Sequence, residues 1–387
     1  MTATNKMGLY WHIPYCRKAC HYCNFHFSTN LKSVDLLLEA MLVELRLRTA
    51  ELEGKMIETI YFGGGTPSIL SADQIMKLLE AVSRIAVIPP NIEITFECNP
   101  EDLEAGSYLK ALKAYTHINR LSVGVQSFYD EHLLYMNRSH SGQMALSAIK
   151  RAQDTGFENI TADLIYGVPG LTDKQWESNV ATMVGLGVPH ISCYALTLEP
   201  KTPLEHLVKV GKLAAPTDEL MAQHFNILIE ALGKAGFLQY EISNFARPGF
   251  EAVHNKNYWF GVPYMGLGPG AHSFDGVATR SWNISNNQLY INQLLEQKIR
   301  PFEKETLTDV EQLNEFIMTR LRTMEGVAFQ ELAERWGHST LDLLLKKGAV
   351  YVGEGLLEAS GGRTLLLSSK GKLLADKITS DLFFDAK

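Results

Sequence analysis

Residues 10–23 read Tyr10-Trp-His-Ile-Pro-Tyr-Cys16-Arg-Lys-Ala-Cys20-His-Tyr-Cys23, a cysteine-rich run close to the start of the chain. The three cysteines have the spacing C-x3-C-x2-C, and no fourth cysteine lies on the same short segment. Three thiolates can hold three irons of a 4Fe-4S cluster and leave the fourth iron open. An open iron can bind a small molecule and pass an electron to it, so this segment predicts redox chemistry.

These cysteines could instead bind zinc or form a disulfide. Zinc could take the three thiolates together with His12, His21 or His26, but structural zinc usually draws its ligands from two separate segments. A disulfide is less favoured, because five cysteines is an odd number and the first residues lack the apolar core of a signal peptide. The other two cysteines, Cys98 and Cys193, are predicted to be buried strand residues.

The composition limits the classes of protein that fit. The chain has 387 residues, of which 46% are hydrophobic and 20% charged, with a net charge of -7. That is enough for a large core and predicts roughly two or three domains. No apolar run is long enough for an integral membrane segment, and the mild acidity argues against a nucleic-acid partner. We expect a soluble, cytoplasmic protein.

Short β-rich segments alternate with helical ones along the first half of the chain. Such alternation predicts right-handed crossovers and a parallel sheet, which forms either a full or partial barrel or an open doubly wound sheet. Helix starts are indicated by Ser71–Gln74, Thr172–Gln175 and Asn99–Asp102. The first strand ends at the cysteines, which places them at the carboxyl-terminal rim, where barrel enzymes do their chemistry. The six predicted strands are 9–13, 59–62, 93–97, 120–125, 159–165 and 190–195.

Further polar and glycine residues follow these strands. The run Tyr61-Phe-Gly-Gly-Gly-Thr-Pro-Ser68 comes directly after the second strand, and glycine lets the backbone approach a ligand closely. Glu97 ends the third strand and could hold a hydroxyl or amino group, or could cap a helix. Gln126, Arg138 and Asp163 follow or end the next strands, and each could equally be a surface polar residue.

These motifs resemble the radical S-adenosylmethionine superfamily, and within it the oxygen-independent coproporphyrinogen III oxidase-like family. The resemblance runs from Leu9 to about Phe274 and also rests on Glu97-Cys-Asn-Pro100 and Gly124-Val-Gln-Ser-Phe128. It implies a partial (β/α)6 TIM-like barrel, with Cys16, Cys20 and Cys23 holding the cluster and S-adenosylmethionine binding its open iron. The implied S-adenosylmethionine contacts are Tyr10, Gly64, Gly65, Thr66, Glu97, Gln126, Arg138 and Asp163.

Two departures point to one branch of that family. Phe25 stands where true oxidases carry a further cysteine, and the cysteine run begins after only fifteen residues. Both match the oxidase-like heme chaperones, as does the H-N-x-x-Y-W motif at His254–Trp259. The resemblance therefore implies heme binding and delivery to acceptor, respiratory hemoproteins, and it allows a homodimer. The alternative is an oxidase that decarboxylates coproporphyrinogen III by radical chemistry, and whether S-adenosylmethionine is cleaved stays open.

Four residues are candidates for the heme site. His254 could be an axial ligand, and Tyr258 and Trp259 could offer flat apolar faces to a porphyrin. A histidine beside two aromatic residues is as often a hydrogen-bonded anchor of the fold. His272, in the segment Gly266-Leu-Gly-Pro-Gly-Ala-His-Ser273, is the second candidate for the axial ligand.

The chain is predicted to divide into three parts. Residues 1–240 would form the barrel, 241–300 a post-barrel segment with the H-N-x-x-Y-W motif and a polar helical connector, and 301–387 a small C-terminal domain. Helical patterns at 308–322, 329–336, 340–347 and 370–382, with a hairpin at 356–367, give this last part a winged-helix-like character. Its acidic residues argue against DNA binding.

Overall fold

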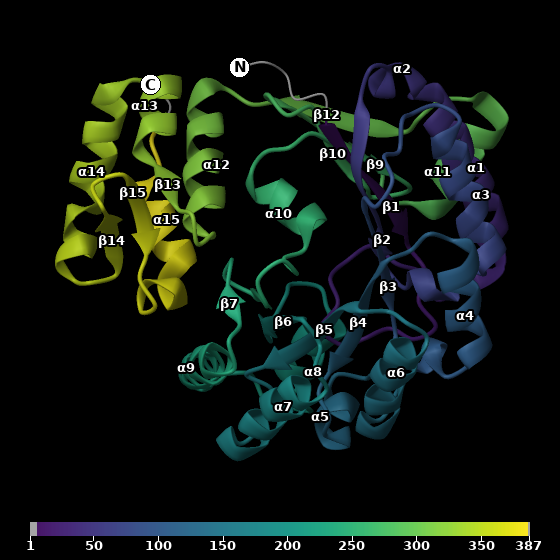
Figure 1. Ribbon diagram of the computed structural model, residues 1–387, viewed down its shortest axis with the longest axis horizontal. Coiled ribbons are helices and arrows are strands. Elements are labelled where there is room, and N and C mark those ends of the chain that lie inside the picture. Colours follow the sequence, from purple (N-terminus) through teal and green to yellow (C-terminus); the bar gives the residue numbers. More distant parts are fainter. Residues whose placement is uncertain (1–5, 386–387) are drawn as a thin grey trace.

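The computed structural model describes residues 6–385 and places most strands in one twelve-stranded sheet. Six parallel strands occupy its centre in sequence order, as the sequence predicts: β1 (Lys6–Ile13), β2 (Met56–Gly64), β3 (Glu93–Cys98), β4 (Arg120–Gln126), β5 (Asn159–Tyr166) and β6 (His190–Ala195). The sheet curves into an incomplete barrel, with helices along its outer side (Figure 1). The predicted partial barrel is confirmed.

The helices between these strands carry the chain back so that each strand starts at the same edge. They are α1 (Val34–Leu47), α2 (Thr49–Leu52), α3 (Ala72–Ser83), α4 (Gly106–Tyr115), α5 (Asp130–Tyr135), α6 (Gly142–Asp154) and α7 (Asp173–Gly185), with single 3-10 turns at Leu31–Ser33, Pro67–Ile69 and Pro100–Leu103. Two further helices, α8 (Pro203–Lys209) and α9 (Asp218–Lys234), follow β6. Both predicted capping boxes, Ser71 with Gln74 and Thr172 with Gln175, are present. None of the helices between residues 6 and 385 is long and apolar enough to span a membrane.

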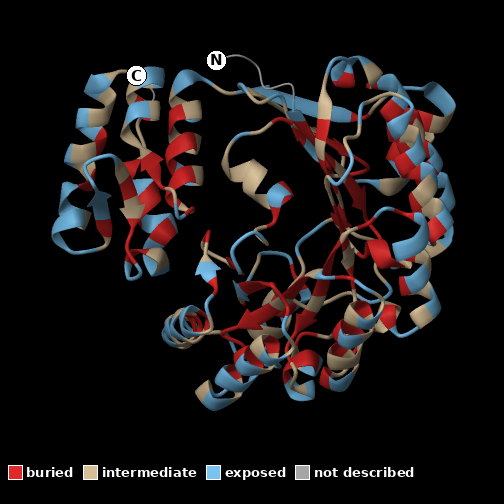
Figure 2. Cartoon of the chain, viewed as in Figure 1, coloured by how far each residue is buried: buried red, intermediate tan, exposed pale blue. Residues whose placement is uncertain are grey.

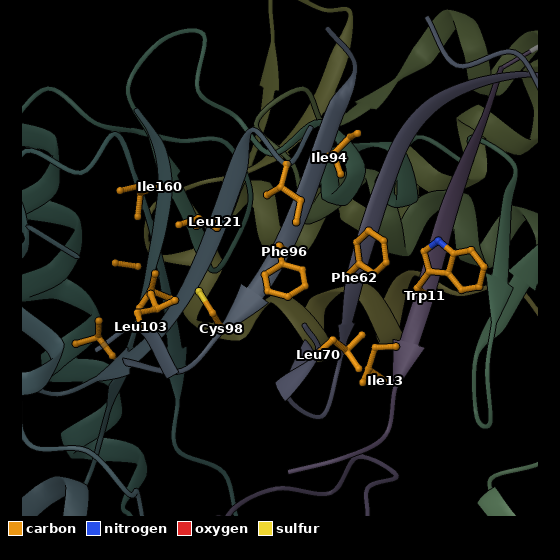
Figure 3. Packing of buried hydrophobic residues seen from close by; sticks show 14 of the residues in the cluster. Trp11, Ile13, Phe62, Leu70, Ile94, Phe96, Cys98, Leu103, Leu121 and Ile160 are labelled. Atoms are coloured by element: carbon orange, nitrogen blue, oxygen red, sulfur yellow. The ribbon is translucent and has the colours of Figure 1, made fainter. Parts of the chain in front are cut away.

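Alternate residues of the central strands pack between the sheet and the outer helices. Trp11 and Phe62 stack on neighbouring strands with ring centroids 6.3 Å apart, and Phe62 meets Phe96 edge-on at 5.9 Å. Figure 3 shows this row of outward-facing apolar side chains. Because side chains alternate across a strand, the residues between them, such as Tyr10 and Tyr61, face the inside of the barrel. Buried residues concentrate on the strands and on the helix faces that meet them (Figure 2).

Segments after residue 240 extend the sheet at both edges, which the sequence did not reveal. β8 (Asn244–Ala246) pairs antiparallel with β6 and with β7 (Leu238–Gln239). β9 (Tyr264–Leu267) pairs parallel with β1, and β10 (His272–Phe274), β11 (Thr279–Asn283) and β12 (Phe302–Thr306) continue antiparallel from it. Between them lie α10 (Val253–Trp259), α11 (Asn287–Asn292) and a π-helix at Gln293–Gln297. The limits 1–240, 241–300 and 301–387 stay a prediction.

The C-terminal part has a core of its own. Leu313, Ile317 and Leu332 belong to an apolar cluster separate from that of the barrel. The predicted helices and hairpin are found as α12 (Asp309–Leu321), β13 (Val327–Ala328), α13 (Phe329–Trp336), α14 (His338–Gly353), β14 (Leu357–Ser360), β15 (Thr364–Leu367), a 3-10 turn at Gly371–Leu374 and α15 (Ala375–Leu382). This part stands beside the open side of the barrel, with α10 between the two (Figure 1).

Candidate functional site at the rim of the barrel

The three cysteines lie on a loop that leaves the end of β1 and is closed at its base. The Cys16 amide donates to the Ser28 carbonyl at 3.0 Å, and the Ser28 amide donates to the Pro14 carbonyl at 2.9 Å. Across the loop, the Asn137 side chain donates to the Ala19 carbonyl at 2.7 Å. All five cysteines of the chain are free thiols, so the disulfide alternative is wrong, and Cys98 and Cys193 are buried on β3 and β6 as predicted.

The histidines of the zinc alternative have other partners. His12 is hydrogen-bonded to the Tyr10 hydroxyl at 3.0 Å, His21 to the Tyr135 carbonyl at 2.8 Å and His26 to the Asn287 side chain at 2.7 Å. Among residues 6–385, no three His, Cys, Asp or Glu side chains converge on a point that could hold a single metal ion. A 4Fe-4S cluster takes one thiolate on each of three separate irons, so its cysteines need not converge on a single point.

The glycine run at the end of β2 packs directly against the strand that leads into the cysteine loop. The Gly65 amide donates to the Ile13 carbonyl at 2.9 Å, and a Cβ at Gly65 would lie 2.7 Å from the Tyr15 carbonyl oxygen. Gly64 has a φ of +107°, and a Cβ there would lie 2.6 Å from the His12 ring. Both positions therefore require glycine, and they bring the backbone to the rim beside the cysteines.

Two carboxyl groups face the inside of the barrel. Glu97 accepts hydrogen bonds from the Tyr61 hydroxyl at 2.7 Å and from the Gly64 amide at 3.2 Å, so it does not cap a helix. Asp163 lies opposite Ser192 across the β5–β6 ladder. Burial is the main cause that raises the pKa of each carboxyl to about 7, and at Glu97 the charge of Asp163 contributes to the rise. Both line a cavity of about 50 Å³.

Arg138 joins the cysteine loop to the barrel. Its guanidinium donates to Cys20 Sγ at 3.4 Å, to the Asn99 side chain at 2.7 Å and to the Gly124 carbonyl at 2.8 Å. Its Nε is buried with no hydrogen-bond partner, and so is Oε1 of Gln126, which has a φ of +67°. Unpaired buried polar atoms and a strained backbone at one rim are typical of a site that binds a polar ligand.

Asn99 corrects one prediction. The segment Asn99–Asp102 forms a 3-10 turn and not the start of an α-helix, and α4 begins only at Gly106. The Asn99 side chain does not cap this turn, since it contacts Arg138 and donates to the Thr66 hydroxyl at 3.3 Å. Sequence reasoning missed its place in the site because an Asn-Pro pair is also a common helix start.

The H-N-x-x-Y-W motif forms α10, which lies between the barrel and the C-terminal part. His254 is only 2% exposed. Its ring is hydrogen-bonded to the Thr59 hydroxyl and to the Tyr258 hydroxyl, each at 2.8 Å, and burial lowers its pKa to about 3. At the end of the same helix, the Arg322 guanidinium lies 5.6 Å from the ring centroid of Trp259. The motif therefore connects the inner wall of the barrel to α12 and its C-terminal end.

Comparison with known families defines the class of protein. The model of the radical SAM superfamily matches residues 10–182, and that of the HemN C-terminal domain matches residues 307–374. The solved structure of coproporphyrinogen III oxidase, HemN, from Escherichia coli superposes with a TM-score of 0.84 over 99% of this chain and 91% of that chain; at 22% identity this likeness shows the fold alone. Fold and cysteine loop together are those of a radical SAM protein, a superfamily characterised by a 4Fe-4S cluster and S-adenosylmethionine.

Curated relatives narrow this class further. The heme chaperone HemW of Bacillus subtilis is 36% identical over 95% of this chain and 97% of its own length. HemW of Mycobacterium tuberculosis is 35% identical over 97% of this chain and 94% of its own length. The zebrafish Danio rerio has a relative named radical S-adenosyl methionine domain-containing protein 1, mitochondrial, which is 32% identical over 94% of this chain and 82% of its own length. The chain belongs to the HemW family.

Proposed function

We propose that this protein is a heme chaperone, which binds heme and delivers it to acceptor, respiratory hemoproteins. The observation that carries the proposal is family membership along nearly the whole chain, because the relatives that match at 35–36% identity over 95–97% of it are named heme chaperones. The proposed compartment is the cytoplasm. The proposed partners are heme, the acceptor hemoproteins and a second copy of this chain.

Within this function we assign the 4Fe-4S cluster to Cys16, Cys20 and Cys23. The donor set fits, since three free, half-buried thiols sit on one loop and the Arg138 guanidinium, close to Cys20, would offset the negative charge of thiolate ligands. When bound, the cluster can supply one electron to S-adenosylmethionine. The remaining assigned residues would orient that molecule: Tyr10, Gly64, Gly65, Thr66, Glu97, Gln126, Arg138 and Asp163.

Phe25 supports the chaperone over the oxidase. Its side chain is 68% exposed beyond the third cysteine, where the oxidases have a further cysteine. A phenyl ring offers iron no ligand and the oxidase reaction no thiol, so that position cannot take part in redox or acid-base chemistry. An exposed aromatic ring on the cysteine loop is instead suited to contact with another macromolecule.

The proposal is tested on protein reconstituted anaerobically with iron and sulfide. Hemin is titrated and followed in the Soret band, and the loaded protein is then mixed with an apo-hemoprotein to measure transfer. We expect a saturable complex and transfer of heme, with no decarboxylated product from coproporphyrinogen III, S-adenosylmethionine and a reductant assayed in parallel. Formation of the decarboxylated product without heme binding would contradict the proposal and support the oxidase alternative.

Binding of S-adenosylmethionine is expected to weaken as the pH falls from 8 to 6. Glu97 and Asp163, with pKa values of about 7, are ionised above that range and protonated below it, and their charge attracts the cationic ligand. Each group lost to protonation should lower affinity several-fold, or about 1 kcal/mol. Calorimetric titration at pH 6, 7 and 8 measures this, and Glu97→Gln should flatten the dependence. A wild-type affinity that does not change with pH would contradict the assignment.

The same two carboxyls should affect the stability of the ligand-free protein. Their folded pKa values lie above the ordinary values of 4.5 and 3.8. The stability that the two protonated carboxyls contribute is therefore fully present below about pH 4. It is lost as the pH rises through 7, because ionisation of a carboxyl inside the barrel is costly. Glu97→Gln, which cannot ionise, should reduce that loss at pH 8 while it weakens ligand binding. Thermal unfolding midpoints of both proteins at pH 5 and pH 8 measure the difference.

A further inference from the structure

We propose that the imidazole of His272 is the axial ligand that this protein gives to heme iron, and that Trp282 is the residue that positions it. The inference rests on the proposed heme-binding function and assigns the site within it. It differs from the expectation that the histidine of the H-N-x-x-Y-W motif, His254, is the ligand.

The surroundings of His254 argue against that role. An axial ligand needs one ring nitrogen with a free lone pair and enough open space for a flat macrocycle. Both ring nitrogens of His254 are held by hydroxyl groups, those of Thr59 and Tyr258, and the ring lies inside the barrel. Coordination of iron there would break at least one buried hydrogen bond and would require α10 to leave the barrel wall.

His272 has the opposite surroundings. It begins β10, its side chain is exposed, and no hydrogen bond from the described residues 6–385 holds its ring. Partial burial and the Arg280 charge lower its pKa, so the ring is neutral at pH 7 and carries a lone pair. A neutral, accessible imidazole without a partner is the form that binds iron.

Trp282 holds this imidazole in one orientation. The two residues face each other across the β10–β11 ladder, and their rings stack with centroids 5.8 Å apart and planes inclined by 26°. The indole is itself fixed by a hydrogen bond from Nε1 to Glu303 at 3.1 Å. An axial imidazole stands upright on the porphyrin plane, so a ring stacked on it also stands upright. Trp282 therefore steers the ligand and does not lie flat on the macrocycle.

His272 lies close to the segment that carries the cysteines. The preceding turn contains Gly268 and Gly270, where a Cβ would lie 2.6 Å from the His12 carbonyl oxygen and 3.6 Å from the His26 Cβ. Both histidines belong to the segment that carries the cysteines. Heme bound at His272 would thus lie at the same rim of the barrel as the cluster.

One exposed axial ligand also suits delivery. A heme that is held through a single iron–nitrogen bond at the rim keeps much of its surface accessible, and an acceptor can supply the second axial ligand before the first is released. A heme enclosed in the barrel beside His254 would offer no such access.

The test compares three histidine variants of the full-length protein after anaerobic reconstitution. Hemin titration should show that His272→Ala binds at least ten-fold more weakly than wild type, whereas His254→Ala has the smaller effect. His338→Ala is the matched control, because His338 is an exposed histidine on α14 in the C-terminal part, and the variant should bind hemin as wild type does. Unchanged affinity in His272→Ala, or a larger loss in His254→Ala, would overturn the inference.

A spectroscopic readout separates ligation from a structural role. His272→Tyr should bind hemin with the Soret and charge-transfer bands of a phenolate-bound ferric heme, which only a change of axial ligand produces. Trp282→Phe should keep the histidine-ligated spectrum with weaker binding. If wild-type protein binds no hemin at all, the proposed function fails; if it binds hemin and His272→Tyr leaves the spectrum unchanged, only this assignment fails.

Discussion

Serine in place of Cys20 is expected to leave the protein without its iron–sulfur cluster. A hydroxyl is a far poorer iron ligand than a thiolate, and the loop offers only three cysteines, so each is essential. We expect iron and acid-labile sulfide after reconstitution to fall to about a tenth of the wild-type content or less. The broad visible absorbance of the cluster and any reductive cleavage of S-adenosylmethionine should be lost with it.

The chain provides its own control for this experiment. Cys98 is a buried thiol on β3, and it donates to the Ser122 carbonyl at 3.5 Å. Cys98→Ala removes one cysteine without touching the loop, and it should keep the full iron content at a cost of about 1 kcal/mol in stability. Equal loss of iron in both variants would mean that the cluster is not specific to the loop. Stoichiometric zinc in wild-type protein that Cys20→Ser removes would instead support the zinc alternative.

The central strands could be predicted because their signals are local. Each is a short apolar run bounded by turn residues, and the cysteines and Glu97 fall at strand ends, where a parallel sheet brings them to one rim. The same reasoning places the capping boxes correctly, since a Ser or Thr and a Gln three residues later satisfy each other within one turn.

The edges of the sheet could not be predicted in this way. β9 pairs with β1 across more than 250 residues, with Gly8 opposite Tyr264, and no local pattern encodes a partner so far along the chain. β9 is parallel to β1, whereas each of β10, β11 and β12 is antiparallel to the strand before it in the sheet. The meeting of His272 and Trp282 as a cross-strand pair at the rim therefore has no signature in the sequence.

The side chains of the site likewise divide into features that the sequence predicts and features that only the structure reveals. The family resemblance places Arg138 and Gln126 in the site, but the sequence does not show that each keeps an unpaired buried atom. His254 was nominated for its chemistry, and the fold uses both of its nitrogens for hydrogen bonds. Whether a polar residue is an anchor or a ligand depends on what surrounds it in space, which spacing along the chain does not record.

Glutamine in place of Glu44 is expected to destabilise the protein far more than Cys98→Ala does. Glu44 is fully buried on α1 and accepts from Arg48 at 3.0 Å, with the Arg300 guanidinium at 3.2 Å. The Tyr290 hydroxyl, the Asn283 side chain and the Gly268 amide also donate to it. Removal of its charge would leave Arg300 without its anion and Arg48 with Glu51 alone, at a cost of about 3–5 kcal/mol.

The position of Glu44 gives this prediction a second readout and a matched control. The carboxylate holds the Gly268 turn that packs on His12, so Glu44→Gln should weaken hemin binding as well as lower the midpoint of thermal unfolding. Glu51→Gln removes the other acidic partner of Arg48, a half-exposed one, and should cost about 1 kcal/mol or less. Equal losses in the two variants would mean that Arg48 and Arg300 find other partners or water, and that the turn before His272 does not depend on this buried network.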